Sequence, residues 1–129
     1  MSEATDLTKH SPVEAHGPPP LLHRTADYRG VTSPILRDGA ALSGLLISAA
    51  GAAGLSTAEP PMVRSLPRDG LAVLLLLDLG HLTVHTIPSR ETLLFDLLVP
   101  IGRDPQKAVD VFTRKLGTAE ARSGRLARG

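Results

Sequence analysis

Histidines are the residues of this 129-residue chain best suited to metal binding or proton transfer, and five are spread along it. His81 and His85 share the alternating segment His-Leu-Thr-Val-His-Thr-Ile. Residues four apart on a strand lie about 13 Å apart, because each residue advances the chain by roughly 3.3 Å. Zinc ligands lie only about 2 Å from the ion, so these two histidines cannot share one. The other three, at positions 10, 16 and 23, are distant in sequence, and we expect no metal site.

Other motifs that carry catalytic chemistry are missing. The chain has no cysteine, which excludes disulfides, thiolate nucleophiles and cysteine-bound metals. It has no Gly-x-Ser-x-Gly elbow, P-loop or dinucleotide-binding glycine fingerprint. The candidate that remains is one face of a strand, carrying His81, Thr83 and His85 beside Leu79 and Gly80. Taken alone, such a face is typical of the solvent side of a half-buried sheet.

Composition argues against nucleic-acid and membrane partners. Aromatic residues make up 2% of the chain, too few for base-stacking platforms, and the net charge of +1 gives no strongly basic face. The longest stretch without charge, residues 39–58, holds four glycines and is strongly apolar only in its middle. A spanning helix needs about 20 predominantly apolar residues. No secretory signal is visible, and we expect a cytoplasmic protein.

The composition changes twice along the chain. Residues 1–20 are polar and rich in proline, which predicts a disordered N-terminal tail. Residues 117–129 are small, polar and basic, which predicts a flexible C-terminal tail. Residues 21–116 between them are long enough for a single domain.

Two helices are expected in this domain. The first runs from about Asp38, a plausible N-cap, to Ala53, with Gly54 following as its C′ residue. Its four glycines (39, 44, 51 and 54) are best explained by close packing against a sheet. The second begins at Asp104-Pro105, an N-cap followed by proline at N1, and ends at Gly117.

Strands account for most of the rest. Residues 21–29 suit an edge strand, and apolar or alternating runs predict strands at 62–66, 71–77, 81–87 and 92–99, separated by turn residues. On 81–87, Leu82, Val84 and Thr86 should face one way, and the histidines with Thr83 and Ile87 the other. This order predicts an α+β two-layer sandwich, a mostly antiparallel sheet with two helices on one face.

The segment Gly70–Pro88 resembles the core of the prokaryotic S-adenosylmethionine decarboxylases. In that family a hydrophobic strand precedes Glu-Ser-His-(Leu/Ile)-(Thr/Ser)-(Ile/Val)-His-(Thr/Ser)-aromatic-Pro-Glu. Here His-Leu-Thr-Val-His-Thr-Ile-Pro fits the second half, and Asp96 falls where a later strand of the family carries Asp. Weaker matches to the family's first strand, first helix and terminal Asp-Pro helix extend the resemblance over residues 21–116.

The resemblance also shows what has been lost. Family members form a pyruvoyl group when the serine of Glu-Ser attacks the preceding carbonyl and the ester eliminates; the ketone then acts as an electron sink. Leu79-Gly80 occupies the position of that pair, and Gly80 has no hydroxyl. The family's cysteine acid aligns near Pro100, and Ser89 replaces the final Glu. We therefore expect no pyruvoyl cofactor, while His85 matches the histidine that assists processing in the family.

Three hypotheses follow. The first is a member of this family, whose pathway is polyamine (spermidine) biosynthesis, without decarboxylase activity. It would bind an S-adenosylmethionine-like molecule through Leu79, His81 and Thr83, or regulate an active paralogue. The resemblance implies a homodimer, or a heterodimer with that paralogue. The second is an enzyme acting on S-adenosylmethionine or a related amine without a pyruvoyl group. The third is a plain α+β interaction module.

Overall fold

The computed structural model describes residues 20–117 and 120–129, so the predicted tail of residues 1–20 lies almost wholly outside it. In chain order the elements are β1 (Leu21–Arg29), α2 (Ser33–Leu36), α3 (Gly39–Ala52), β2 (Met62–Ser65), η2 (Pro67–Asp69), β3 (Leu71–Leu76), β4 (His81–Ile87), η3 (Pro88–Arg90), β5 (Thr92–Pro100), α4 (Pro105–Leu116) and β6 (Glu120–Arg128). Each helix and strand that the sequence predicts is present within a few residues of its expected bounds.

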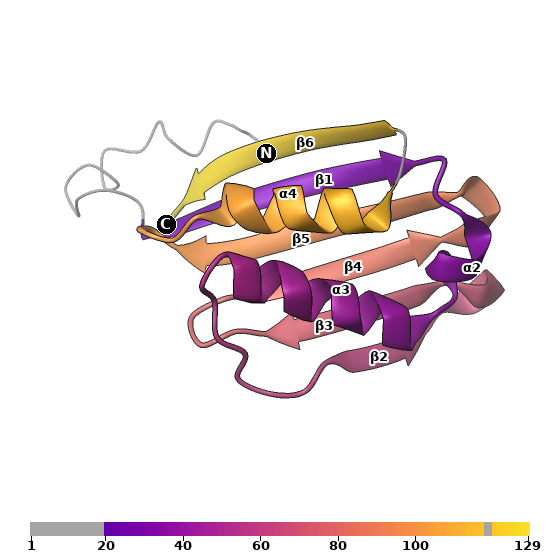
Figure 1. Cartoon of the computed structure of the whole chain (residues 1–129), viewed down its shortest axis with the longest axis horizontal. Coiled ribbons are helices and arrows are strands. Elements are labelled where there is room, and N and C mark those ends of the chain that lie inside the picture. The colour runs from indigo at the N-terminus through magenta and orange to yellow at the C-terminus, as the bar shows by residue number, and fades with distance from the viewer. Residues whose placement is uncertain (1–19, 118–119) are drawn as a thin grey trace.

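The six strands form one antiparallel sheet in the order β2-β3-β4-β5-β1-β6. Both long helices, α3 and α4, lie on the same face of this sheet, and the opposite face carries none of the helices that the structure describes (Figure 1). We call that second side the open face. The predicted α+β two-layer sandwich is confirmed.

Helix α3 begins where the sequence places it. The carboxylate of Asp38 accepts a hydrogen bond from the backbone N–H of Ala41 at 3.0 Å, and Gly54 has the positive φ of a C′ residue, +72°. The packing role expected for the helix glycines is wrong for Gly44 and Gly51, since a Cβ at either would meet nothing within 4 Å. Only Gly39 lies in close contact, with a Cβ there 2.8 Å from Val63.

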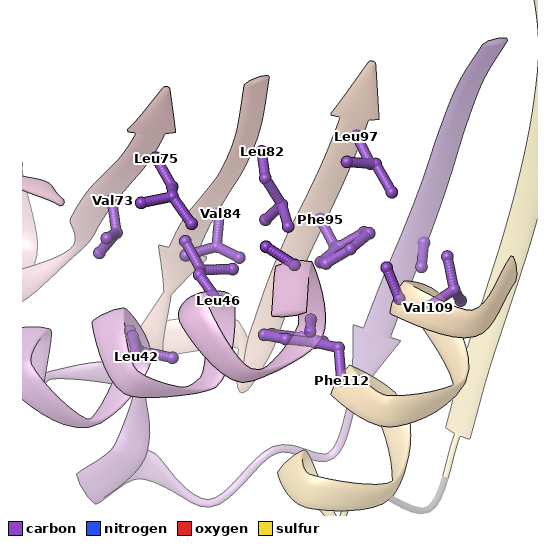
Figure 2. Close-up of a cluster of buried hydrophobic side chains, with 14 of the residues drawn as sticks. Leu42, Leu46, Val73, Leu75, Leu82, Val84, Phe95, Leu97, Val109 and Phe112 are labelled. Carbon is purple, nitrogen blue, oxygen red and sulfur yellow. The ribbon is translucent and has the colours of Figure 1, made fainter. Parts of the chain in front are cut away.

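Helix α4 is attached to the sheet by aromatic rings. Phe112 is fully buried, and its ring centroid lies 4.7 Å from that of Phe95 on β5 and 5.6 Å from that of Tyr28 on β1. Figure 2 shows Phe112 pointing from α4 toward Phe95 and the aliphatic side chains of the sheet. The Tyr28 hydroxyl is 2.7 Å from the Thr113 hydroxyl, and burial raises the pKa of Tyr28.

The C-terminal segment corrects one prediction. Within residues 117–129, expected to be a flexible tail, β6 pairs with β1 along the full length of both strands. The expected edge strand β1 is therefore internal, between β5 and β6. All residues of β6 are exposed, so no apolar alternation marks it in the sequence, and backbone hydrogen bonds to β1 define it instead.

None of the helices within the described ranges is long and apolar enough to cross a lipid bilayer.

Removing the central aromatic ring should weaken the whole domain. Phe112→Ala is expected to lower the free energy of unfolding by about 3–5 kcal/mol, because it leaves a cavity between α4 and the sheet. Urea unfolding followed by circular dichroism measures this, with Ile47→Ala on the exposed side of α3 as the control that should change little. A loss for Phe112→Ala below about 1 kcal/mol would show that the aromatic cluster does not hold the layers together.

Candidate functional site

Leu79 and Gly80 lie at the tip of the β3–β4 hairpin. The Leu77 N–H donates to the Gly80 carbonyl at 2.9 Å and closes a tight turn, and the Leu79 side chain is 69% exposed. The Asp78 N–H donates to the Ser56 carbonyl at 3.0 Å, which ties the turn to the segment after α3. The turn is thus held by backbone bonds on two sides.

Gly80 packs directly against the backbone of β5. A Cβ at this position would lie 2.0 Å from the Leu98 carbonyl oxygen and 3.0 Å from its carbon. Those are backbone atoms of a paired strand and cannot move aside as a flexible side chain would. Glycine is therefore required here for space, and any side chain would force β4 and β5 apart.

The crevice beside the turn is very small. It holds about 20 Å³ and is bordered by Leu77, Leu79, Gly80, Pro100 and Arg103, among others. Pockets for small molecules usually measure about 300–1,000 Å³. The crevice beside Gly80 thus offers no room for a ligand within this one chain.

Strand β4 alternates as the sequence predicts. Leu82, Val84 and Thr86 are buried beneath the helices, and His81, Thr83, His85 and Ile87 lie on the open face. Buried Thr86 is fully satisfied: its hydroxyl donates to the Leu36 carbonyl at 2.8 Å and accepts from the Leu71 N–H at 2.9 Å.

Sequence reasoning missed a second group of polar residues on this open face. Asp96 on β5 lies opposite Thr83 of β4 and opposite Thr25 of β1, so three polar side chains form a row across three strands. The His23 ring contacts the Asp96 carboxylate through Nε2, while Arg128 Nη1 lies 3.3 Å from His23 Nδ1. These contacts fit the tautomer that donates from Nε2 and accepts at Nδ1. The open face therefore holds a connected Arg–His–Asp chain beside Thr83.

The five residues singled out in the sequence do not converge on one point. Thr83 belongs to the row with Asp96 and Thr25, and His81 lies two residues from it on the same face of β4. His85 lies toward the other end of β4, beside a separate pocket of about 350 Å³ formed with Pro67, Arg68 and Pro88 among others. Five residues along a strand separate Gly80 from His85 by roughly 16 Å. In the described part of the chain, no three metal-ligating side chains cluster.

Similarity to known proteins places this fold among the S-adenosylmethionine decarboxylases. The family model described as S-adenosylmethionine decarboxylase matches residues 22–129, and the chain belongs to that family. It is similar to the S-adenosylmethionine decarboxylase proenzyme of Brevibacillus brevis, with 32% identity over 109 residues that cover 83% of this chain and 80% of the relative. The crystal structure of the adenosylmethionine decarboxylase from Aquifex aeolicus VF5 superposes with a TM-score of 0.77 at 23% identity, over 87% of this chain and 92% of that one, and confirms the fold.

A side chain at position 80 should strain the protein. Gly80→Ser and Gly80→Ala are both expected to cost about 1–3 kcal/mol of stability, because each places a Cβ against the Leu98 carbonyl. Gly44→Ala, on an open helix surface, should instead stabilise by up to about 1 kcal/mol.

Intact mass spectrometry completes this test. The native chain and the Gly80→Ser variant should each remain a single polypeptide, 13.6 kDa for the native one. Two fragments divided between residues 79 and 80 would contradict the assignment of this turn as unable to self-process.

Proposed function

We propose that this chain is a non-catalytic member of its family. It forms no pyruvoyl group, binds an S-adenosylmethionine-like molecule on its open face, and associates with a second chain through that face. The observation that carries the proposal is the packing of Gly80 beneath the Leu98 carbonyl.

Self-processing requires a hydroxyl that attacks the preceding carbonyl carbon, breaks the peptide bond and leaves an ester. Gly80 has no hydroxyl to attack the Leu79 carbonyl, and the backbone of β5 occupies the space where one would be attached. Pro100 aligns near the family's cysteine acid and has no side-chain proton to donate. Because the chain is not cleaved, no pyruvoyl ketone forms, and the chain has no electron sink for decarboxylation.

The open face still offers contacts to a cationic nucleoside. S-adenosylmethionine carries an amine and a sulfonium, and the partly exposed Asp96 carboxylate is the negative group nearest the centre of this face. Thr83 and Thr25 flank it with hydroxyls that donate or accept hydrogen bonds. Leu94 and Leu98, on either side of Asp96 along β5, provide an apolar surface for a purine ring.

A second chain explains why the face keeps His85 when Gly80 has lost its serine. Since roughly 16 Å of strand separates them, the two positions cannot serve one reaction within a single chain. A partner chain packed over the open face would meet His85 directly. Partly exposed apolar side chains on the same face would be covered by such a partner: Met62, Leu74, Leu76, Leu94 and Leu98.

Binding of the proposed ligand should be visible as thermal stabilisation. S-adenosylmethionine and its decarboxylated form, titrated separately to millimolar concentration, should raise the melting temperature; a hundredfold excess over Kd corresponds to about 2.7 kcal/mol. Thr83→Val should remove most of the shift, because Thr83 lies directly opposite Asp96, and Thr57→Val, an exposed threonine elsewhere, should not.

The same samples separate the three hypotheses. S-adenosylmethionine should be recovered unchanged, without release of carbon dioxide. Release would contradict the non-catalytic proposal and favour an enzyme with altered chemistry. If neither ligand shifts the transition, the ligand-binding proposal fails and the interaction module becomes the better hypothesis.

Association through the open face should depend on its apolar centre. Sedimentation analysis of the native chain is expected to show a species of twice the chain mass, or of mixed composition when a processing-competent homologue is added. Leu94→Asp should dissociate it by placing a charge within the covered surface. Ile47→Asp, on the helix face, is the control and should leave the assembly intact. Equal behaviour of the two variants would argue against the open face as the interface.

A further inference from the structure

A second cavity lies on the opposite side of the sheet from the candidate site. It measures about 570 Å³ and opens between the first turn of α4 and the inner sides of β1 and β6. Figure 1 shows that α4 lies over β1 and β5 while β6 extends beyond it, which leaves a corner uncovered by helix. The residues that define this corner are Leu22, Arg24, Pro105, Gln106, Arg125 and Ala127.

Two positive charges face each other in this cavity. Arg24 on β1 and Arg125 on β6 are directly opposite in the strand register, so their Cβ atoms lie about 4.5–5.5 Å apart. Like charges directly opposite on a sheet are destabilising. Among residues 20–117 and 120–129, neither guanidinium forms an ion pair with a carboxylate.

Arg24 is held in place by a neutral group. Its Nη2 donates to the Gln106 side-chain oxygen, and the Gln106 amide nitrogen donates in turn to Asp110 at 2.7 Å. The Arg24 Nε is buried and has no hydrogen-bond partner within the described part of the chain. Asp104 is the only carboxylate among the described residues that line the cavity, and it accepts from the Lys107 N–H at 3.2 Å as the N-cap of α4. The guanidinium is thus oriented while its charge stays uncompensated and one donor stays unused.

The remaining walls are apolar. Leu22, Pro105 and Ala127 provide them, and the volume is within the usual range for small-molecule sites. A buried, unpaired donor costs free energy that an anion placed against it would recover. An apolar wall with one cationic end selects a molecule with an apolar body and one anionic group.

We propose that this cavity binds a small organic molecule with a single anionic group. Its carboxylate or phosphate would accept hydrogen bonds from Arg24 and Arg125, and its apolar chain or ring would lie against Leu22 and Pro105. The guanidinium fork suits both anions, since each presents two oxygens in one plane. Arg24 and Arg125 share the helix side of the sheet, while His23 of the open face also borders the cavity. The proposal does not rest on the proposed S-adenosylmethionine-like ligand.

Octanoate and octyl phosphate are the probes, with 1-octanol as a neutral control and octylamine as a cationic one. Isothermal titration calorimetry of the full chain should show binding of one or both anions and much weaker binding of the two controls. The anion that binds more tightly shows whether the cavity prefers a carboxylate or a phosphate. Equal binding of octanoate and 1-octanol, or no binding of either anion, would overturn the proposal.

Variants locate the site. Arg24→Met keeps the apolar stem but removes the charge, and should weaken anion binding by about tenfold or more, which equals about 1.4 kcal/mol. Arg64→Met, an exposed arginine on β2, is the matched control and should bind as the native chain does. Ala127→Phe fills the cavity from an exposed strand position and should abolish binding while circular dichroism stays native. Native-like binding by a folded Ala127→Phe variant would place the anion elsewhere and overturn the assignment.

Discussion

The contact of three aromatic rings between α4 and the sheet is the interaction on which the rest of the structure depends. The chain contains one Tyr and two Phe, and Tyr28, Phe95 and Phe112 all meet in this cluster. They hold α4 over β1 and β5, on one face of the sheet. Because no ring is left for the other face, that face presents histidines, threonines and aliphatic side chains instead. The asymmetry between the two faces thus follows from where three side chains are buried.

Gly80 shows how closely the backbone of β5 constrains the β3–β4 turn. A Cβ at this position would lie 2.0 Å from the Leu98 carbonyl oxygen, and the nearby crevice holds only about 20 Å³. The hydrogen-bonded turn from Leu77 to Gly80 and the alternation of β4 are properties of the backbone and of the buried residues. Neither depends on a side chain at position 80, so the fold can form whether or not that position carries a reactive group.

Local signals in the sequence were sufficient for most of the fold. The caps at Asp38 and Asp104 and the alternation of residues 81–87 are short-range features, and each corresponds to a helix start or strand in the structure. Long-range pairing was not accessible in this way. Nothing local shows that β6 pairs with β1, since its side chains are exposed throughout.

Part of the candidate site, the contact between His23 and Asp96, could not be predicted from the sequence for the same reason. His23 is far from Asp96 in sequence, and the two meet only because β1 lies next to β5 in the sheet. The alternation within residues 21–29 could have shown which side chains share a face. It could not have shown which strand would be the neighbour. The prediction that the glycines of α3 pack against the sheet was wrong for a different reason. Composition cannot distinguish a glycine that is needed for space, such as Gly39, from one on an open surface, such as Gly44.

Strand β1 separates the two proposed binding surfaces and contributes to both. Its residues alternate between faces, so His23 and Thr25 belong to the open face, while Leu22 and Arg24 line the cavity beside α4. Side chains on opposite faces share the backbone but no partner: His23 contacts Asp96, and Arg24 contacts Gln106. Substitutions without shared partners generally act additively. An organic anion held by Arg24 and a cationic nucleoside held near Asp96 would therefore occupy the molecule together, with the sheet as a rigid wall between opposite charges.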